Sequence, residues 1–162
     1  MTVSAPATVP ILETEQVSDA VAVEALVTAA FGPGRFAKTA ERLREGATPA
    51  AAFVVRQGGR LIGSVRLWPV TVGGVEGLFL GPIAVDAAAR GSGVGGDLVA
   101  ACVAFAKDAG VDGVLLVGDP PYFERFGFQP APDAVLPGPV DRRRVMWLPV
   151  TVEAVAGPVR QV

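Results

Sequence analysis

A glycine-rich turn between an apolar strand and an amphipathic helix constrains this chain more than any other segment. Residues 77–85 read GLFLGPIAV, and after a short connector residues 91–96 (GSGVGG) lead into a helical pattern that extends to Ala109. A glycine turn at a helix N-terminus leaves several backbone N–H groups without intrahelical acceptors, at the positive end of the helix dipole. Such a turn binds anions, and the usual anion is a phosphate or pyrophosphate. We therefore expect a phosphorylated small molecule to bind at this turn.

The composition indicates a single globular domain. The chain has 162 residues, of which 51% are hydrophobic, and its formal net charge is −2. A charge of this sign gives no basic field that would attract nucleic acid. No apolar run approaches the roughly 20 residues of a membrane span, and the N-terminus lacks the basic start of a signal peptide. We expect a cytoplasmic protein that binds neither nucleic acid nor membrane.

The residue types that are missing exclude several kinds of chemistry. The chain has no histidine and one cysteine, Cys102. A Cys/His zinc site, a Ser-His-Asp triad, a Cys-His nucleophile pair and an internal disulfide are therefore excluded, and we expect no metal. Cys102 falls at helical spacing with Leu98, Phe105 and Ala109, which predicts a buried position. The chemistry must come from carboxylates, the single tyrosine Tyr122, backbone groups or a bound cofactor.

The order of the predicted elements indicates a mixed α/β sheet. Glycine pairs at 58–59 and 73–74 mark hairpin turns between three successive strands. The single domain is expected over residues 9–150, with 1–8 and 151–162 as terminal extensions. Predicted strands cover 9–14, 51–56, 60–72, 75–85, 113–117 and 145–150, with a short one at Phe128, and predicted helices cover 20–31, 36–44, 93–109 and 120–125, the last with Asp119 as its N-cap.

Two motifs for phosphate binding match only in part. The segment 91–96 satisfies the dinucleotide pattern G-x-G-x-x-G, but in that fold the glycines follow a parallel strand directly. Here residues 86–90 intervene and the preceding strands are joined by hairpins. The segment 32–39 (GPGRFAKT) is similar to a P-loop, but it follows a helix and has Ala37 where the motif needs glycine. We interpret it as a connector between helices.

A third pattern fits better and is supported by a second motif. Arg90-x-x-Gly93-x-Gly95 matches the R/Q-x-x-G-x-G/A motif of the GNAT superfamily of acyl-CoA-dependent N-acetyltransferases. Gly81-Pro82 must interrupt strand pairing, because proline has no N–H to donate, and the family uses a bulge here to separate two strands. Residues 122–128 (YFERFGF) resemble the family's F-Y-x-x-L/F-G-F segment. The resemblance covers roughly residues 9–150 and is specifically to a branch of small bacterial predicted N-acetyltransferases.

The resemblance implies a fold and a cofactor. The fold is a mostly antiparallel sheet of about six or seven strands with about four helices, and the cosubstrate is acetyl-CoA. Backbone groups of the turn would bind the CoA pyrophosphate, and those of the bulged strand would pair with the pantetheine arm while a nearby N–H polarises the thioester. The cofactor-binding residues implied are Ile83, Ala84, Val85, Arg90, Gly91, Ser92, Gly93, Val94, Gly95, Gly96 and Phe123.

The resemblance also implies direct attack of an amine on the thioester. Glu76 is the candidate base, although it also fits a solvent-facing residue at a strand end. Phe123 stands where the family has the tyrosine that protonates the CoA thiolate, so either Tyr122 or water takes that role. The acceptor is expected to be a primary amine of a small molecule or a peptide. Candidate acceptor contacts are Phe31, Arg35, Phe36, Arg66, Trp68 and Phe79.

Three functions follow from these patterns. The first is an acetyl-CoA-dependent N-acetyltransferase. The resemblance also allows a homodimer, since many members of the family are dimers. The second is a catalytically degenerate module that binds CoA as a sensor or partner protein. The third is a dinucleotide-dependent oxidoreductase. The arginine run 142–144 is interpreted as a solvated turn.

Overall fold

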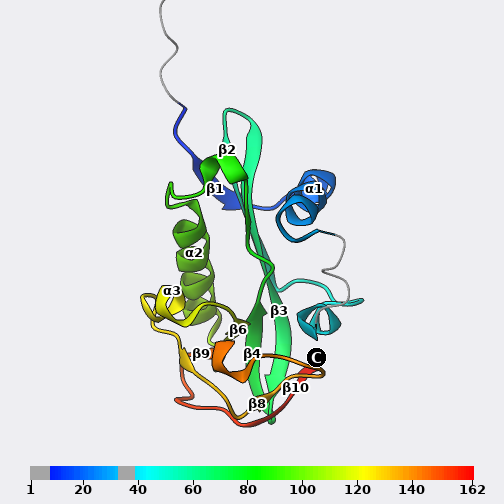
Figure 1. The fold of residues 1–162 in the computed structure, drawn as a ribbon, viewed down its shortest axis with the longest axis vertical. Coiled ribbons are helices and arrows are strands. Elements are labelled where there is room, and N and C mark those ends of the chain that lie inside the picture. The colour runs from blue at the N-terminus through cyan, green and yellow to red at the C-terminus, as the bar shows by residue number, and fades with distance from the viewer. Residues whose placement is uncertain (1–7, 33–38) are drawn as a thin grey trace, which may run out of the picture.

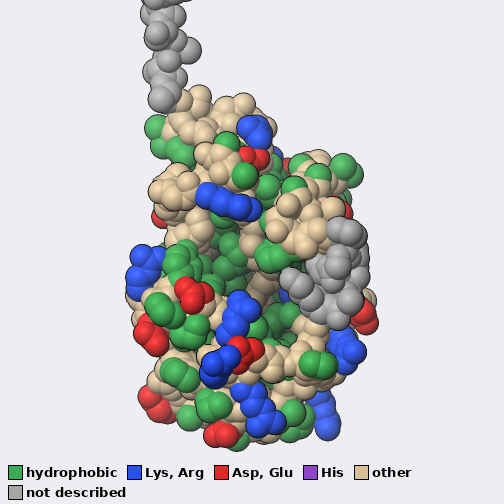
Figure 2. Space-filling model, viewed as in Figure 1, with side chains coloured by type: hydrophobic (Ala, Val, Ile, Leu, Met, Phe, Trp, Pro, Cys, Tyr) green, Lys and Arg blue, Asp and Glu red, His purple; other side chains and the backbone are tan. Residues whose placement is uncertain are grey.

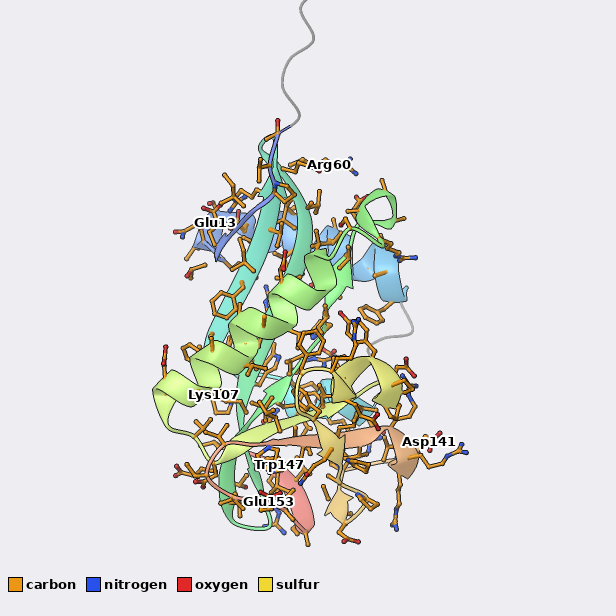
Figure 3. The ribbon with its side chains drawn as sticks, turned by 90° about the vertical axis from the view of Figure 1, so that its left-hand side faces the viewer. Glu13, Arg60, Lys107, Asp141, Trp147 and Glu153 are labelled. Carbon is orange, nitrogen blue, oxygen red and sulfur yellow. The ribbon has the colours of Figure 1, made fainter. Side chains whose placement is uncertain are left out.

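The computed structural model describes residues 8–32 and 39–162. One twisted sheet runs along the molecule, with helix α1 (Ala20–Phe31) against one face and helix α2 (Val94–Ala109) against the other (Figure 1). Seen from the side of α2, this helix crosses the sheet obliquely, with Lys107 near its C-terminal end (Figure 3). The predicted mixed α/β architecture is confirmed.

The sheet is mixed and mostly antiparallel, as expected. In the described residues it has ten strands in the order β1-β2-β3-β4-β6-β9-β7, with β5, β8 and β10 beside this path. The strands are β1 (Ile11–Thr14), β2 (Ala51–Gln57), β3 (Arg60–Val72), β4 (Val75–Leu80), β5 (Ala84–Val85), β6 (Gly113–Val117), β7 (Gln129–Pro130), β8 (Ala134–Val135), β9 (Val145–Pro149) and β10 (Gly157–Gln161). More strands are present than predicted, partly because β5, β7 and β8 comprise only two residues each.

The remaining helices are short. They are α3 (Pro120–Glu124) and the 3₁₀ helices η1 (Val17–Asp19), η3 (Thr39–Leu43), η4 (Ala87–Ala89) and η5 (Arg142–Arg144). The helix predicted over 36–44 was wrong in type over its described part, because Thr39–Leu43 forms a 3₁₀ helix and not an α-helix. So short a segment forms too few bonds to favour an α-helix, and the Thr39 hydroxyl bonds instead to the carbonyl of Pro139. Residues 1–7 and 33–38, which include most of the predicted N-terminal extension and of the P-loop-like segment, lie outside the described residues.

Strand β3 is the longest strand described and lies at the centre of the sheet. It pairs with β2, β4, β5 and β10, and the hairpins at both of its ends were predicted. Gly58 and Gly59, with φ of 60° and 79°, form the turn from β2 to β3. Two consecutive residues with positive φ define the tight turn that matches the twist of a hairpin, and glycine adopts it most easily.

The two faces of the sheet bury different side chains. Val54 and Val55 are neighbours on β2 and therefore point to opposite faces. Val54 packs in a cluster with Val23 of α1, while Val55 packs in the larger cluster that contains Cys102 of α2. Cys102 is fully buried, as its helical spacing predicted.

Part of the C-terminal segment 151–162 belongs to the sheet. Within this segment β10 pairs with β3 through Val159 and Val72, and Val159 is buried. The N–H of Gly73 also donates to the carbonyl of Pro158 at 2.9 Å. The segment predicted as a terminal extension is thus an integral part of the fold.

Candidate functional site

A gap opens in the sheet between β4 and β6. These parallel strands pair only through Leu78 with Val114 and Phe79 with Leu115. Beyond these pairs β5 stays beside β3, whereas β6 continues beside β9 as far as Val117. A cavity of about 560 Å³, called the main cavity below, occupies the opening.

The main cavity is bounded by segments that are distant in the sequence. The β4–β5 connector forms one wall, and the end of β6 together with α3 forms another. Figure 2 shows a hollow on this face of the molecule with hydrophobic side chains inside it and charged side chains around it. The lining includes Phe31, Thr39, Ala40, Arg44, Phe79, Leu80, Gly81, Pro82, Ile83, Leu116, Val117, Phe123, Leu136, Pro139, Val140, Asp141 and Arg144.

The strand predicted over residues 75–85 is divided into β4 and β5. Leu67 pairs with Leu80 on one side of the break, and Ser64 pairs with Ala84 on the other. Between these pairs, two residues of β3 lie opposite three residues of the connector, which makes a β-bulge. The interruption predicted from the Gly-Pro dipeptide is confirmed, and it coincides with the divergence from β6.

Hydrogen bonds hold the bulge in place. The N–H of Gly81 donates to the carbonyl of Arg66 at 2.9 Å. The indole Nε1 of the buried Trp68 donates to the carbonyl of Gly81 at 2.6 Å. Both main-chain polar groups of Gly81 are therefore paired, and Pro82, which follows, has no N–H to satisfy.

The main-chain groups of Ile83 and Val85 point away from β3, toward the gap. The N–H of Asp86 donates to the carbonyl of Ile62 at 2.8 Å. Hydrogen-bonded pairs alternate along an antiparallel ladder, so Ala84 bonds to β3 while its two neighbours turn outward. Two of the three predicted strand positions thus offer main-chain groups to a ligand, and Ala84 does not.

The glycine turn lies at the N-terminus of α2, as predicted. Gly93 is the N-cap residue with φ of 90°, and Gly91 has φ of 82°. A Cβ on either glycine would meet no atom within 4 Å. Glycine is required here by the left-handed backbone, and the space above the turn is open to a ligand.

The first turn of α2 supplies the unpaired donors. The N–H groups of Val94, Gly95 and Gly96 precede the first intrahelical bond, which runs from the N–H of Asp97 to the carbonyl of Gly93 at 3.0 Å. They have no acceptor within the helix, and they lie at its positive end. The turn can therefore bind an anion.

Two predicted residues before the helix have different roles in the turn. Ser92 directs both its N–H, at 3.2 Å, and its hydroxyl to the carbonyl of Ala89, so it stabilises the loop from within. The side chain of Arg90 is exposed and forms no ion pair with the described residues. Its guanidinium is available to an anion on the turn.

Two aromatic rings pack beside the first turn of α2, those of Tyr122 in α3 and of Phe126 just after it. The Tyr122 hydroxyl lies 3.4 Å from the position that a Cβ would take on Gly95, and the Phe126 ring lies 3.7 Å from the same position on Gly96. These two glycines therefore also make room for the two rings. The Arg125 guanidinium covers the Tyr122 ring at 4.5 Å from its centroid.

Phe123, unlike Tyr122, lines the main cavity. The two rings are nearly perpendicular, with centroids 4.9 Å apart. Phe123 also packs against Gly118, where a Cβ would clash with its ring. Asp119 precedes α3 at the predicted N-cap position, but its carboxylate forms no capping bond and its main-chain carbonyl accepts instead.

The structure does not bring Glu76 to the cavity. Glu76 is exposed at the start of β4, where its carbonyl accepts from the N–H of Asp112 at 3.0 Å. The bulge follows Leu80 at the other end of the strand, about 13 Å away for an extended chain. Glu76 does not line the main cavity. Its placement matches the alternative interpretation, a solvent-facing residue at a strand end.

Three charged residues of the main cavity were missed by the sequence analysis. Arg44 forms an ion pair with Glu41 at 2.7 Å, and Arg144 donates from Nε to the carbonyl of Gly118 at 3.2 Å. Asp141 accepts hydrogen bonds from Arg143, which lower the pKa of its carboxyl below the usual value. The arginine run was interpreted as a solvated turn, and nothing in the sequence separates Arg144 from its neighbours.

The candidate acceptor residues divide between two cavities. Phe31 and Phe79 line the main cavity, while Arg66 and Trp68 line a smaller one of about 250 Å³, called the second cavity below. Both cavities share Arg44 and Pro82 as lining residues. The other two candidates, Arg35 and Phe36, lie outside the described residues.

The thiol of Cys102 is buried in the core. Burial raises the pKa of the Cys102 thiol to about 12, so the residue is protonated at neutral pH. Among residues 8–32 and 39–162 there is no cluster of side chains suited to a metal ion. No helix in the same part of the chain is long and apolar enough to cross a membrane.

The fold and the site together define a class of protein. A bulged strand separates from its parallel neighbour beside an anion-binding helix N-terminus, in the order that the motifs of the acyltransferases predicted. A model of the acetyltransferase (GNAT) family matches residues 21–128. The chain belongs to this family, and N-acetyltransferase is its enzyme class.

Individual relatives agree with this assignment. The chain is 33% identical over 114 residues to the N-acetyltransferase YhbS of Escherichia coli K12, with 68% of each chain covered. The crystal structure of E. coli YhbS in complex with CoA superposes with a TM-score of 0.82 at 27% identity, covering 99% of this chain and 94% of that one. A GNAT acetyltransferase of Brucella melitensis in complex with acetyl-CoA gives a TM-score of 0.76 at 26% identity, with coverage of 96% and 97%.

Proposed function

We propose that this chain transfers the acetyl group of acetyl-CoA to a primary amine of a small molecule or a protein, by direct attack of the amine on the thioester. The observation that carries the proposal is the bulge after Leu80, which turns the main-chain groups of Ile83 and Val85 toward a gap in the sheet. The crystal structures of the two relatives contain CoA and acetyl-CoA, which supports the same cosubstrate here.

The glycine turn fits the pyrophosphate of CoA. The N–H groups of Val94, Gly95 and Gly96 point out of the helix end, and the space above Gly91 and Gly93 is open. Charge favours the same ligand, because the helix dipole stabilises an anion at this end by about 0.3–1 kcal/mol. Arg90 adds a full positive charge next to the turn.

The gap between β5 and β6 fits the pantetheine arm. An extended chain with amide groups can pair with the outward main-chain groups of Ile83 and Val85 as an added strand. The hydrophobic lining of the main cavity, including Leu116 and Phe123, suits the aliphatic parts of the arm. The N–H of Ile83 is the donor nearest the bulge that can polarise a thioester carbonyl, because Pro82 has none.

The transfer step requires little chemical assistance from side chains. Bound acetyl-CoA supplies an acyl group that is already activated as a thioester. The chain holds the amine and the carbonyl together, a C–N bond forms, the C–S bond breaks, and the amine loses a proton to water. Water fits better than Tyr122 as the proton source for the thiolate, because the Tyr122 hydroxyl lies beside Gly95 at the pyrophosphate end.

A thermal-shift titration with acetyl-CoA, CoA and NAD tests the cosubstrate. We expect acetyl-CoA and CoA to raise Tm and NAD to leave it unchanged. Ligand at 100 times its Kd stabilises the fold by about 2.7 kcal/mol. A shift with NAD alone would favour the oxidoreductase that shares the glycine pattern.

The two ends of α2 provide matched variants for this test. Gly93 and Gly110 cap the same helix with φ of 90° and 69°, and a Cβ on either meets nothing within 4 Å. Gly93→Glu and Gly110→Glu therefore strain the backbone alike, but only the first places a carboxylate where the pyrophosphate would bind. We expect Gly93→Glu alone to abolish the acetyl-CoA shift, and equal loss in both variants would contradict the assigned site.

The placement of two residues keeps a second function open. Phe123 lines the main cavity where the family has a tyrosine, and Glu76 is remote from it. A catalytically degenerate CoA-binding module would show the same thermal shift without turnover. Release of free thiol from acetyl-CoA in the presence of a panel of primary amines separates the two. A cytoplasmic location and a homodimer stay predictions.

A further inference from the structure

The second cavity lies behind the bulge, between α1, η3 and β3. Ser64, Arg66 and Trp68 alternate along β3 and therefore share the face that forms its floor. Pro82 and Arg44 line this cavity as well as the main cavity, so the two adjoin at the bulge. A ligand at the bulge would therefore lie beside both cavities.

Ser64 is exceptional among the polar side chains described. It is fully buried, and its Oγ is the one buried side-chain oxygen or nitrogen in the described residues that has no hydrogen-bond partner. Its cross-strand neighbours, Val54 and Ala84, are apolar and buried. A buried hydroxyl without a partner destabilises a fold, so its presence in a cavity wall needs an explanation.

The charged groups around Ser64 already have partners. Arg44 pairs with Glu41 at 2.7 Å, and Arg66 donates from Nε and Nη2 to both carboxylate oxygens of Glu15, at 3.2 and 3.1 Å. Glu24, which also lines the cavity, is likewise engaged. A charged ligand group would have to break one of these pairs, whereas a neutral group need not.

We propose that the second cavity is a subsite for an uncharged hydrogen-bonding group of the acceptor, a hydroxyl or a carboxamide, which bonds to Ser64. The proposal rests on the proposed function, since it places the reacting amine at the bulge. The acceptor is then an amine with a hydroxyl or amide a few bonds away. An apolar group would leave Ser64 unpaired, and the volume of about 250 Å³ admits only a small group.

Matched pairs of primary amines test this subsite. Each pair is a linear amino alcohol with two to six carbons and the alkyl amine in which a methyl replaces the hydroxyl, and a second series carries a terminal carboxamide. Binding to the protein is measured by calorimetry with and without CoA, so that no turnover is needed. At one chain length we expect the wild-type protein to bind the polar member about 3- to 10-fold more tightly.

Ser64→Ala separates binding from folding. We expect this variant to bind both members of the preferred pair within about 2-fold, and to be at least as stable as the wild type because a buried unpaired hydroxyl is gone. Ser18→Ala, an exposed serine outside the cavity, is the control and should keep the wild-type preference.

Two results would overturn the subsite. One is a wild-type protein that prefers no polar amine at any length, and the other is a preference that survives in Ser64→Ala. Failure of the proposed function is detected separately, as the absence of a thermal shift with acetyl-CoA. The amine measurements without CoA still decide the subsite in that case.

Discussion

The indole Nε1 of Trp68 donates a 2.6 Å hydrogen bond to the main-chain carbonyl of Gly81, inside the bulge. The bond joins β3 to the β4–β5 connector, at the place where this part of the chain diverges from β6. Gly81 is buried, so water cannot readily replace this donor to its carbonyl. One side chain thus fixes the main chain from which the proposed thioester contact extends.

Trp68→Phe is expected to weaken both the fold and the activity. Removal of Nε1 leaves the buried Gly81 carbonyl unpaired, which costs about 1–3 kcal/mol in the free energy of unfolding. The connector can then shift, and misplacement of reacting groups lowers kcat/KM for acetyl-CoA by about 10-fold or more. Urea denaturation and steady-state kinetics measure the two effects.

Trp147→Phe is the control for this prediction. Trp147 is also buried, and its Nε1 donates to the carbonyl of Val152 at 2.9 Å, away from the bulge. We expect similar destabilisation, with kcat/KM changed by no more than about 2-fold. If the two variants lose activity to the same extent, the bond to Gly81 has no role beyond stability.

The features that depend on local chemistry were predictable from the sequence. Proline has no N–H, so Gly81-Pro82 had to interrupt the ladder, and the structure has a bulge there. Glycines with positive φ had to precede α2, and Gly91 and Gly93 are such residues. Adjacent helical residues point about 100° apart, so the sequence already favoured different surroundings for Tyr122 and Phe123.

The features that depend on distant contacts were not predictable. Arg44, Arg144 and Ser64 line cavities only because segments far apart in the chain meet at the bulge, and no local pattern marks them. Glu76 is different, because both the start of its strand and the bulge were predicted correctly, and their separation follows from the sequence. In the segment 151–162 the alternation of apolar and polar residues is too weak to predict β10. Its partner, β3, lies more than eighty residues earlier in the chain.

Tyr122→Phe is expected to affect binding of the cosubstrate and not the chemical step. The Tyr122 hydroxyl lies beside the first turn of α2, so under the proposed function it lies next to the phosphates of CoA and away from the thiolate. Loss of a hydrogen bond to a charged phosphate raises KM for acetyl-CoA by about 10-fold, with kcat within about 2-fold of wild type. A large fall in kcat together with a changed alkaline limb of the pH profile would instead identify Tyr122 as the acid.

Cys102→Ala tests direct transfer without an acyl-cysteine. The Cys102 thiol is buried, its pKa is raised to about 12, and it packs in the core beneath α2. We expect the variant to keep kcat and to lose roughly 1 kcal/mol of stability from the smaller side chain. In the wild type, a thiol reagent should label Cys102 only as fast as the protein opens. Fast labelling of the native protein, or loss of turnover in the variant, would contradict direct transfer.

The ion pair between Arg56 and Asp19 is expected to make stability depend on pH. Arg56 donates from Nη2 to Asp19 at 2.5 Å and the N–H of Gln16 donates at 2.7 Å, and these bonds, the first above all, lower the pKa of the Asp19 carboxyl below 3.8. The folded state therefore binds fewer protons than the unfolded state, and stability falls as the pH drops from 3.8 through the folded pKa. Arg56→Gln removes the larger cause, so its deficit in unfolding free energy should be full at pH 7 and shrink below pH 3.8.

Urea denaturation between pH 3 and pH 7 measures this deficit, with Arg90→Gln as the control. Arg90 is an exposed cation that forms no ion pair in the described residues, so its loss should leave the acid dependence of stability as in the wild type. Asp19→Asn should remove more of this pH dependence than Arg56→Gln, because the titrating group itself is gone and the contribution of the Gln16 N–H is lost with it. A deficit in Arg56→Gln that is constant from pH 3 to pH 7 would show that Arg56 stabilises the fold through packing and not through the charge on Asp19.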